Sequence, residues 1–244
     1  MIEFNIQRFA LLVKLNLVTN YKTILTFTAA TASLLFFYFL ISPANNITGN
    51  FHADLYNILL FVGGFWVSSL AFKELHDPEK NYIFLTLACS NLEKFLCKLL
   101  LTSLGYVLAL SIGYFILSLI INLFSLLILK QFQPLFNPLH QGILVHIYYY
   151  TILQSVFLLG SIYFKKHVMS KILLTISCFL IILFVFMTIC ARFFLELDTF
   201  SISPFVSYEH WFVLIPNFAK AIFWFYLAPL CWLVTYLRLT ETEL

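Results

Sequence analysis

Six long apolar runs constrain the fold of this chain more than any other feature. A helix needs about 20 mainly apolar residues to cross a bilayer, whereas soluble domains carry about 25% charged residues. Here 62% of the residues are hydrophobic and 10% are charged, which leaves too little polar surface to cover a soluble globule. We therefore predict an all-α integral membrane protein with a single transmembrane domain over residues 1–244. Its six predicted transmembrane helices cover about 23–42, 55–72, 97–129, 143–164, 171–194 and 218–238.

The basic residues predict the orientation of these helices, because cytoplasmic loops carry an excess of Lys and Arg. With the N-terminus inside, 11 of the 14 Lys and Arg residues lie on the cytoplasmic side, and Lys130, Arg192 and Lys220 lie outside. Both termini are then cytoplasmic. The net charge of +3 reflects this bias and implies no nucleic-acid partner.

Two segments outside the predicted spans have amphipathic or aromatic patterns. In residues 1–22, apolar residues from Ile2 to Leu17 recur at near-helical spacing. This pattern favours an amphipathic helix on the inner membrane surface over its alternative, a frayed cytoplasmic extension. Residues 195–217 are too polar for a span and too aromatic for a free loop, which predicts short re-entrant or interfacial helices at the outer surface.

Charge gathers between the second and third predicted spans. Eight of the 25 charged residues lie within positions 73–98. Asp77-Pro78-Glu79 combines an N-cap residue, a first-turn proline and an acid, which predicts a short helix at about 78–88. Ser90-Asn91-Leu92-Glu93 reads as a capping box, which predicts a second helix that begins at Asn91 and runs into the third span.

The second of these helices has one apolar and one charged side. Leu92, Phe95, Leu96 and Leu99 form the apolar stripe, and Glu93, Lys94 and Lys98 lie opposite it. The charged side is either a solvated helix end with lysines reaching the inner headgroups or a surface that holds another protein. The first explanation accounts for the lysines but not for the length and order of this loop.

Three segments, taken in order, resemble the membrane subunits of bacterial type-2 ATP-binding-cassette transporters, the ABC-2 permease group. They read FKELHDPEKNYIFLTLACSNLEKFLCKLL, GSIYFKKHVMSK and WLVTYLRLTETEL. The six-span layout, the amphipathic start and the mixed outer segment are also similar, so the likeness covers essentially the whole chain. Ala88 departs from the pattern, because relatives often carry Pro there, and this leaves open a single bent helix in the loop.

The resemblance implies a function that depends on partners. Such subunits pair, as identical or different chains, around a translocation path in the bacterial inner membrane, in contact with lipid. Each docks on a separate ATPase through a coupling helix in the loop between the second and third spans. For this chain the resemblance places the docking helix and its bracing pair at Leu75, Asp77, Tyr82, Phe84 and Leu85, with Glu93 and Lys94. We expect reversal of both charges at 93 and 94 to uncouple transport and to leave folding intact.

Several motifs are absent from the sequence, and this limits the chemistry of the chain. It has no GxxxxGK[ST], HExxH or GxSxG pattern and no CxxC among its five cysteines. We therefore predict no catalytic, cofactor or metal site in this chain, and ATP is bound by the partner. The predicted spans hold almost no mid-membrane ionisable residue, which favours a lipophilic or amphiphilic cargo, moved outward. The alternative is a non-transporting scaffold or assembly protein that recruits partners through the same loop.

Overall fold

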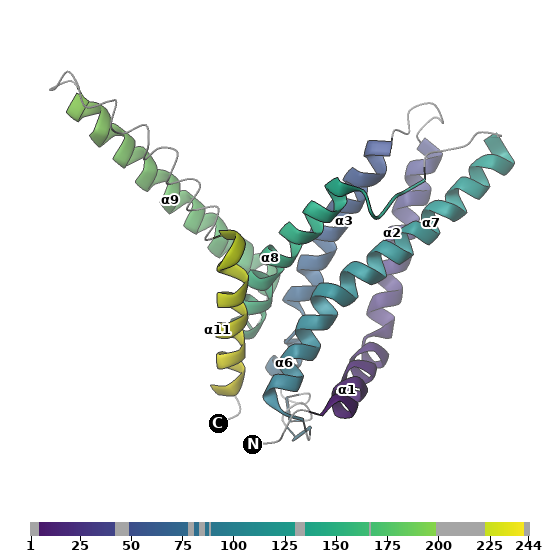
Figure 1. The fold of residues 1–244 in the computed structure, drawn as a ribbon, viewed down its shortest axis with the longest axis horizontal. Coiled ribbons are helices and arrows are strands. Elements are labelled where there is room, and N and C mark those ends of the chain that lie inside the picture. The colour runs from purple at the N-terminus through teal and green to yellow at the C-terminus, as the bar shows by residue number, and fades with distance from the viewer. Residues whose placement is uncertain are drawn as a thin grey trace.

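The computed structural model of this chain describes residues 5–41, 49–77, 81–82, 86–87, 89–129, 135–165, 167–198 and 223–241. Within these ranges every regular element is a helix (Figure 1), which confirms the all-α prediction. Four helical segments there are long and apolar enough to cross a membrane: His52–His76, Asn91–Leu127, Gln141–Tyr163 and Val168–Cys190. They correspond to the second to fifth predicted spans.

The first and sixth predicted spans are not among these four segments. Helix α2 (Tyr21–Ile41) occupies the first predicted span. Helix α11 (Leu227–Glu241) covers the later part of the sixth, and residues 218–222 lie outside the described residues. The count of six spans and the cytoplasmic termini therefore stay predictions, as do the re-entrant helices predicted at 195–217, of which 199–217 also lie outside the described residues.

Helices α3 (Gly49–Ser69), α7 (Tyr106–Leu129) and α8 (Gln141–Tyr163) pack around a core that is rich in tyrosine. Each buried phenol oxygen lies within 3.2 Å of a polar atom on a neighbouring helix. These phenols belong to Tyr56, Tyr106, Tyr114 and Tyr150. Because buried hydroxyl groups are costly without partners, this set of bonds helps to select one arrangement of the three helices.

One helical run leads from the charged loop into the tyrosine core. Helix α6 (Asn91–Leu100) continues through a π-helical turn, η2 (Leu101–Gly105), into α7. The sequence prediction of a helix that begins at Asn91 and runs into the third span is therefore confirmed. The π-helical turn was not predicted.

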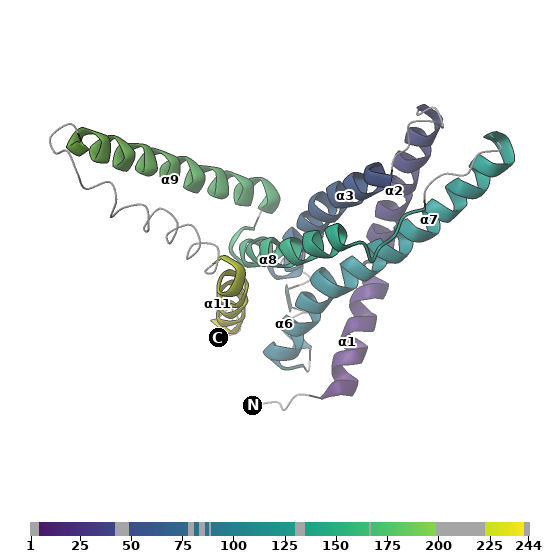
Figure 2. The same ribbon diagram turned by 45° about the horizontal axis from the view of Figure 1, so that its top comes forward.

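Helix α9 (Val168–Asp198) projects away from the other helices (Figures 1 and 2). It joins the rest of the chain at its base, where the buried side chain of Ile172 packs over Gly160 of α8. Further along, every side chain from 177 to 189 is exposed. Such a surface is stable in lipid, which is as apolar as the side chains that face it.

The starts of α1 (Ile6–Thr19) and α6 and the end of α11 gather at one end of the molecule (Figure 1). The short helix α4 (Lys73–His76) joins them there through a second apolar cluster. That cluster contains Ala71, Phe72, Phe95, Leu158, Ile162 and Leu239. The charged loop is thus held against helices that come from all parts of the chain.

Candidate functional site

One carboxylate, that of Glu93, joins the first turns of two helices. Its Oε2 accepts the backbone N–H of Ser90 at 2.9 Å, and Ser90 Oγ accepts the N–H of Glu93 at 3.2 Å. This is the predicted capping box. Glu93 Oε1 accepts the backbone N–H of Asn5, the N-cap residue of α1, at 2.7 Å. Because negative charge is favourable at a helix N-terminus, Glu93 stabilises the starts of α1 and α6 together.

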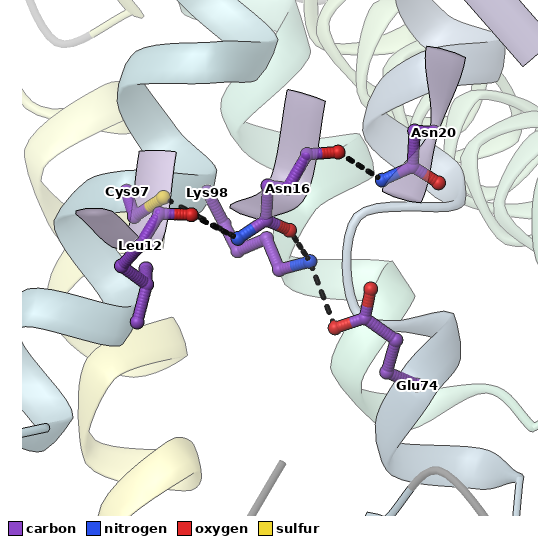
Figure 3. Close-up of polar contacts among 6 residues, drawn as sticks. All are labelled: Leu12, Asn16, Asn20, Glu74, Cys97 and Lys98. Atoms are coloured by element: carbon purple, nitrogen blue, oxygen red, sulfur yellow. Dashed lines mark hydrogen bonds and ion pairs between the residues drawn. The ribbon is translucent and has the colours of Figure 1, made fainter. Parts of the chain in front are cut away.

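The ammonium group of Lys98 holds three helices together (Figure 3). Its Nζ donates to Asn16 Oδ1 of α1 at 2.6 Å and pairs with Glu74 Oε2 of α4 at 3.0 Å. Asn16 also donates through Nδ2 to Cys97 Sγ at 3.6 Å. Lys98 is only 5% exposed, so these acceptors replace the water that its charge would otherwise require.

Helix α4 is anchored on its other side to the end of α8. His76 Nε2 lies 2.9 Å from the backbone carbonyl oxygen of Ser161. Leu75 packs against the apolar cluster shared by α6, α8 and α11. The loop that leaves α4 at Asp77 therefore begins at a helix whose position is fixed by contacts with the rest of the protein.

Helix α1 contacts α6 through one backbone group and one polar side chain, and it turns apolar side chains outward. The backbone N–H of Asn5 and the side chain of Asn16 bond to α6, and Leu12 is buried between them. Leu11 and Val18 are 65% and 60% exposed. This packed helix favours the predicted amphipathic helix over a frayed extension, and the outward apolar side chains suit a membrane surface. Its place at the inner surface stays a prediction.

The predicted docking residues fall into three groups. Leu75 is partly buried in the apolar cluster, and Asp77 is partly buried at the end of α4. Tyr82 is 73% exposed and stands free for a partner. Phe84 and Leu85 lie outside the described residues, as does most of the predicted helix at 78–88. Within that stretch, the N–H of Asn81 donates to the carbonyl of Asp77 at 2.8 Å, the bond expected of a first helical turn.

Glu93 and Lys94, predicted to brace the docking helix, are 0% and 1% exposed. The expectation that charge reversal there would leave folding intact does not fit this burial, because two reversed charges would enter a closed site. The reading of the charged side of α6 as a solvated helix end is wrong for the same reason. Lys98 is enclosed with them.

Sequence reasoning missed the partners of the charged side. They include Asn5, Asn16 and Glu74. Asn16 contributes its side-chain amide, but Asn5 contributes its backbone N–H, and a backbone group leaves no signal in the sequence. Which helix these two residues face depends on packing between segments more than 80 positions apart.

The chemistry of this junction is structural. Burial, and then the nearby Glu93 charge, raise the pKa of the Cys89 thiol, so Cys89 is not an activated nucleophile. No group of three metal-ligating side chains occurs among the described residues. What the arrangement can do is transmit force, because any displacement of α4 or α6 is shared with α1 and α8.

Comparison of the chain with known protein families, curated proteins and solved structures finds no match. Function is therefore argued from the residues and their geometry.

Proposed function

We propose that this chain is a permease subunit of an ABC transporter that docks a separate ATPase through the loop at 73–98. The observation that carries the proposal is the anchoring of that loop at both ends. On one side α4 is held by Glu74 and His76, and on the other α6 is held by Glu93 and Lys98. A protein that pushed on the intervening residues would move α1, α6 and α8 together, as coupling of ATP binding to transport requires.

The composition of the spans supports a lipophilic or amphiphilic cargo. Helices α7 and α8 contain no Asp, Glu, Lys or Arg. The buried polar groups of these two helices are hydroxyls and amides, and the imidazole that lies 3.2 Å from the Tyr114 hydroxyl is that of His52 on α3. A proton-coupled carrier usually needs an ionisable relay at mid-membrane. Outward transport and a second permease subunit, identical or different, complete the proposal.

The test is co-purification from the native cell. The full chain, tagged at its C-terminus, is extracted in mild detergent, and its partners are identified by mass spectrometry. We expect a stoichiometric protein with a Walker loop. Tyr82→Ala should reduce its recovery, because Tyr82 is exposed and its loss leaves the fold unchanged. Tyr226→Ala is the matched control, since Tyr226 is 62% exposed directly before α11, away from the loop.

Two results would contradict the proposal. Recovery of folded chain without any ATPase would favour the scaffold or assembly protein. Equal recovery of the ATPase with Tyr82→Ala and with the parent would remove Tyr82 from the docking surface.

A further inference from the structure

The π-helical turn η2 shifts the backbone hydrogen bonds between α6 and α7. The N–H of Tyr106 donates to the carbonyls of Leu101 and Ser103. In a regular α-helix it would donate to the carbonyl of Thr102, four residues earlier. The turn therefore frees the Thr102 carbonyl from its usual partner, deep inside the protein, where Thr102 is 4% exposed.

Helix α8 supplies the replacement. Tyr150 Oη donates to the freed Thr102 carbonyl at 2.6 Å, and Gln154 Nε2 donates to Thr102 Oγ1 at 2.7 Å. Both side chains are completely buried. The Tyr150 ring lies against Gly64 of α3, where an added Cβ would come within 2.2 Å of the ring. Two polar side chains of α8 thus converge on one residue of the π-helical turn.

A π-helical turn contains one residue more than the same stretch of α-helix, and one residue corresponds to about 100° of rotation. Relaxation of η2 to an α-helix, at unchanged chain length, would turn α6 by about that angle relative to α7. Glu93 and Lys98 would then leave Asn5, Asn16 and Glu74. The hydrogen bonds to Thr102 and the polar contacts of α6 with α1 and α4 therefore belong to the same conformation.

We propose that Tyr150 and Gln154 are positioning residues that hold η2 in its π-helical form, and that η2 is a two-state rotation point between α6 and α7. In the π-helical state α6 is locked to α1 and α4. In the α-helical state α6 is released. Single π-helical turns occur frequently at functional sites. This proposal goes beyond docking of an ATPase and concerns contacts within this chain alone, so it is tested without any partner.

The experiment follows a cross-link between α1 and α6. Asn16→Cys places a thiol beside the native Cys97, because Asn16 Nδ2 lies 3.6 Å from Cys97 Sγ. Lys98 keeps Glu74 as its partner in this parent variant. The other four cysteines are replaced by serine, and the full chain is treated in native membranes with a short bifunctional thiol reagent. The initial rate of cross-linking reports whether α6 is locked to α1.

We expect the parent to cross-link readily. Tyr150→Phe with Gln154→Met should lower the rate about tenfold or more, as expected for the loss of two buried hydrogen bonds. Tyr148→Phe is the matched control. Its hydroxyl donates to the Trp224 carbonyl at 3.2 Å, remote from η2, so the rate should be unchanged.

Deletion of Leu104 separates rotation from general loss of structure. Leu104 is 62% exposed within η2, and its removal permits a continuous α-helix without rotating α6. Added to the Tyr150 and Gln154 substitutions, this deletion should restore the cross-link. Deletion of Leu127, 68% exposed near the far end of α7, should not. An unchanged rate in the double substitution, failure of the Leu104 deletion to restore it, or a parent that does not cross-link would each overturn the proposal.

Discussion

Helices α6 and α9 differ in which side chains they bury and which they expose, and neither follows the pattern of a surface helix in a soluble protein. In α6 the charged side is enclosed, with Glu93, Lys94 and Lys98 at most 5% exposed. In α9 the apolar side chains face outward, and Phe184 and Leu174 are 72% and 63% exposed. Helix α6 buries charged side chains, which water would solvate, and α9 exposes apolar side chains, which are unfavourable in water.

This difference shows which residues determine how helices pack against one another in such a chain. Lipid accommodates apolar side chains as well as a protein interior does, so apolar surface alone does not select a partner helix. A charge away from water must find a specific acceptor or donor. The position of α6 therefore depends on Glu93 and Lys98, whereas α9 is packed through Ile172 at its base and is exposed from 177 to 189.

The largest effect is expected from Glu93→Lys. The new ammonium would lie against the backbone N–H groups of Asn5 and Ser90, and breaking a buried charged contact costs about 3–5 kcal/mol. The thermal unfolding midpoint of the purified chain in detergent should fall strongly. Glu241→Lys is the matched control, because Glu241 pairs with Arg238 on an exposed surface and should change the midpoint little. Similar midpoints for both variants would mean that Glu93 is not enclosed.

Phe184→Lys tests the opposite side of the comparison. A lysine near the centre of a membrane span costs about 2.5–3.5 kcal/mol in membrane insertion, although Phe184 is 72% exposed within the protein. The carbonate-resistant membrane fraction of the full chain should fall. Ser170→Lys, also exposed but in the first turn of α9, should leave that fraction unchanged. Normal insertion of Phe184→Lys would argue that α9 does not face lipid.

Gly64→Ala and Gly113→Ala make the same change in two environments. At Gly64 the new Cβ would overlap the Tyr150 ring, which cannot move freely because it is buried in the core. Overpacking of this kind costs about 1–3 kcal/mol. At Gly113 an added Cβ would meet no atom of another part of the described structure within 4 Å, so alanine should stabilise the helix by up to about 1 kcal/mol. Thermal unfolding midpoints should therefore shift in opposite directions. A stabilising Gly64→Ala would contradict the close approach of α3 and α8.

The smallest effect is expected from Ile182→Ala on α9. Ile182 is 67% exposed, so its side chain makes few contacts with other protein atoms that the substitution could remove. The free energy of unfolding should therefore change by less than about 0.5 kcal/mol. Ile143→Ala provides the reference, since Ile143 is 2% exposed in the tyrosine-rich core and a buried Ile→Ala typically costs about 2–5 kcal/mol. Unfolding of both variants in detergent measures the difference. A comparable loss for Ile182→Ala would mean that protein, not lipid, covers α9.

Local sequence signals predicted the parts of the fold that depend on neighbouring residues. The Ser90–Glu93 capping box set the start of α6, and runs of apolar residues set α8 and α9 to within four positions, whereas α3 begins six positions before the predicted span. These features depend on backbone groups and side chains within one or two helical turns. The same reasoning left open whether the side of α6 that carries Glu93 and Lys94 is solvated, and their burial excludes that alternative.

Contacts between distant segments decided the rest. Glu93 binds Asn5, 88 positions away, and Tyr150 binds the carbonyl of Thr102, 48 positions away. The sequence by itself determined that this chain is helical, that four or more of its helices suit a membrane, and where its charge gathers. Only the tertiary structure decided that the charge is enclosed and that the helix at 91–129 contains a π-helical turn. Periodicity reports which residues share a side of a helix, whereas burial and backbone register depend on the helix that packs against it.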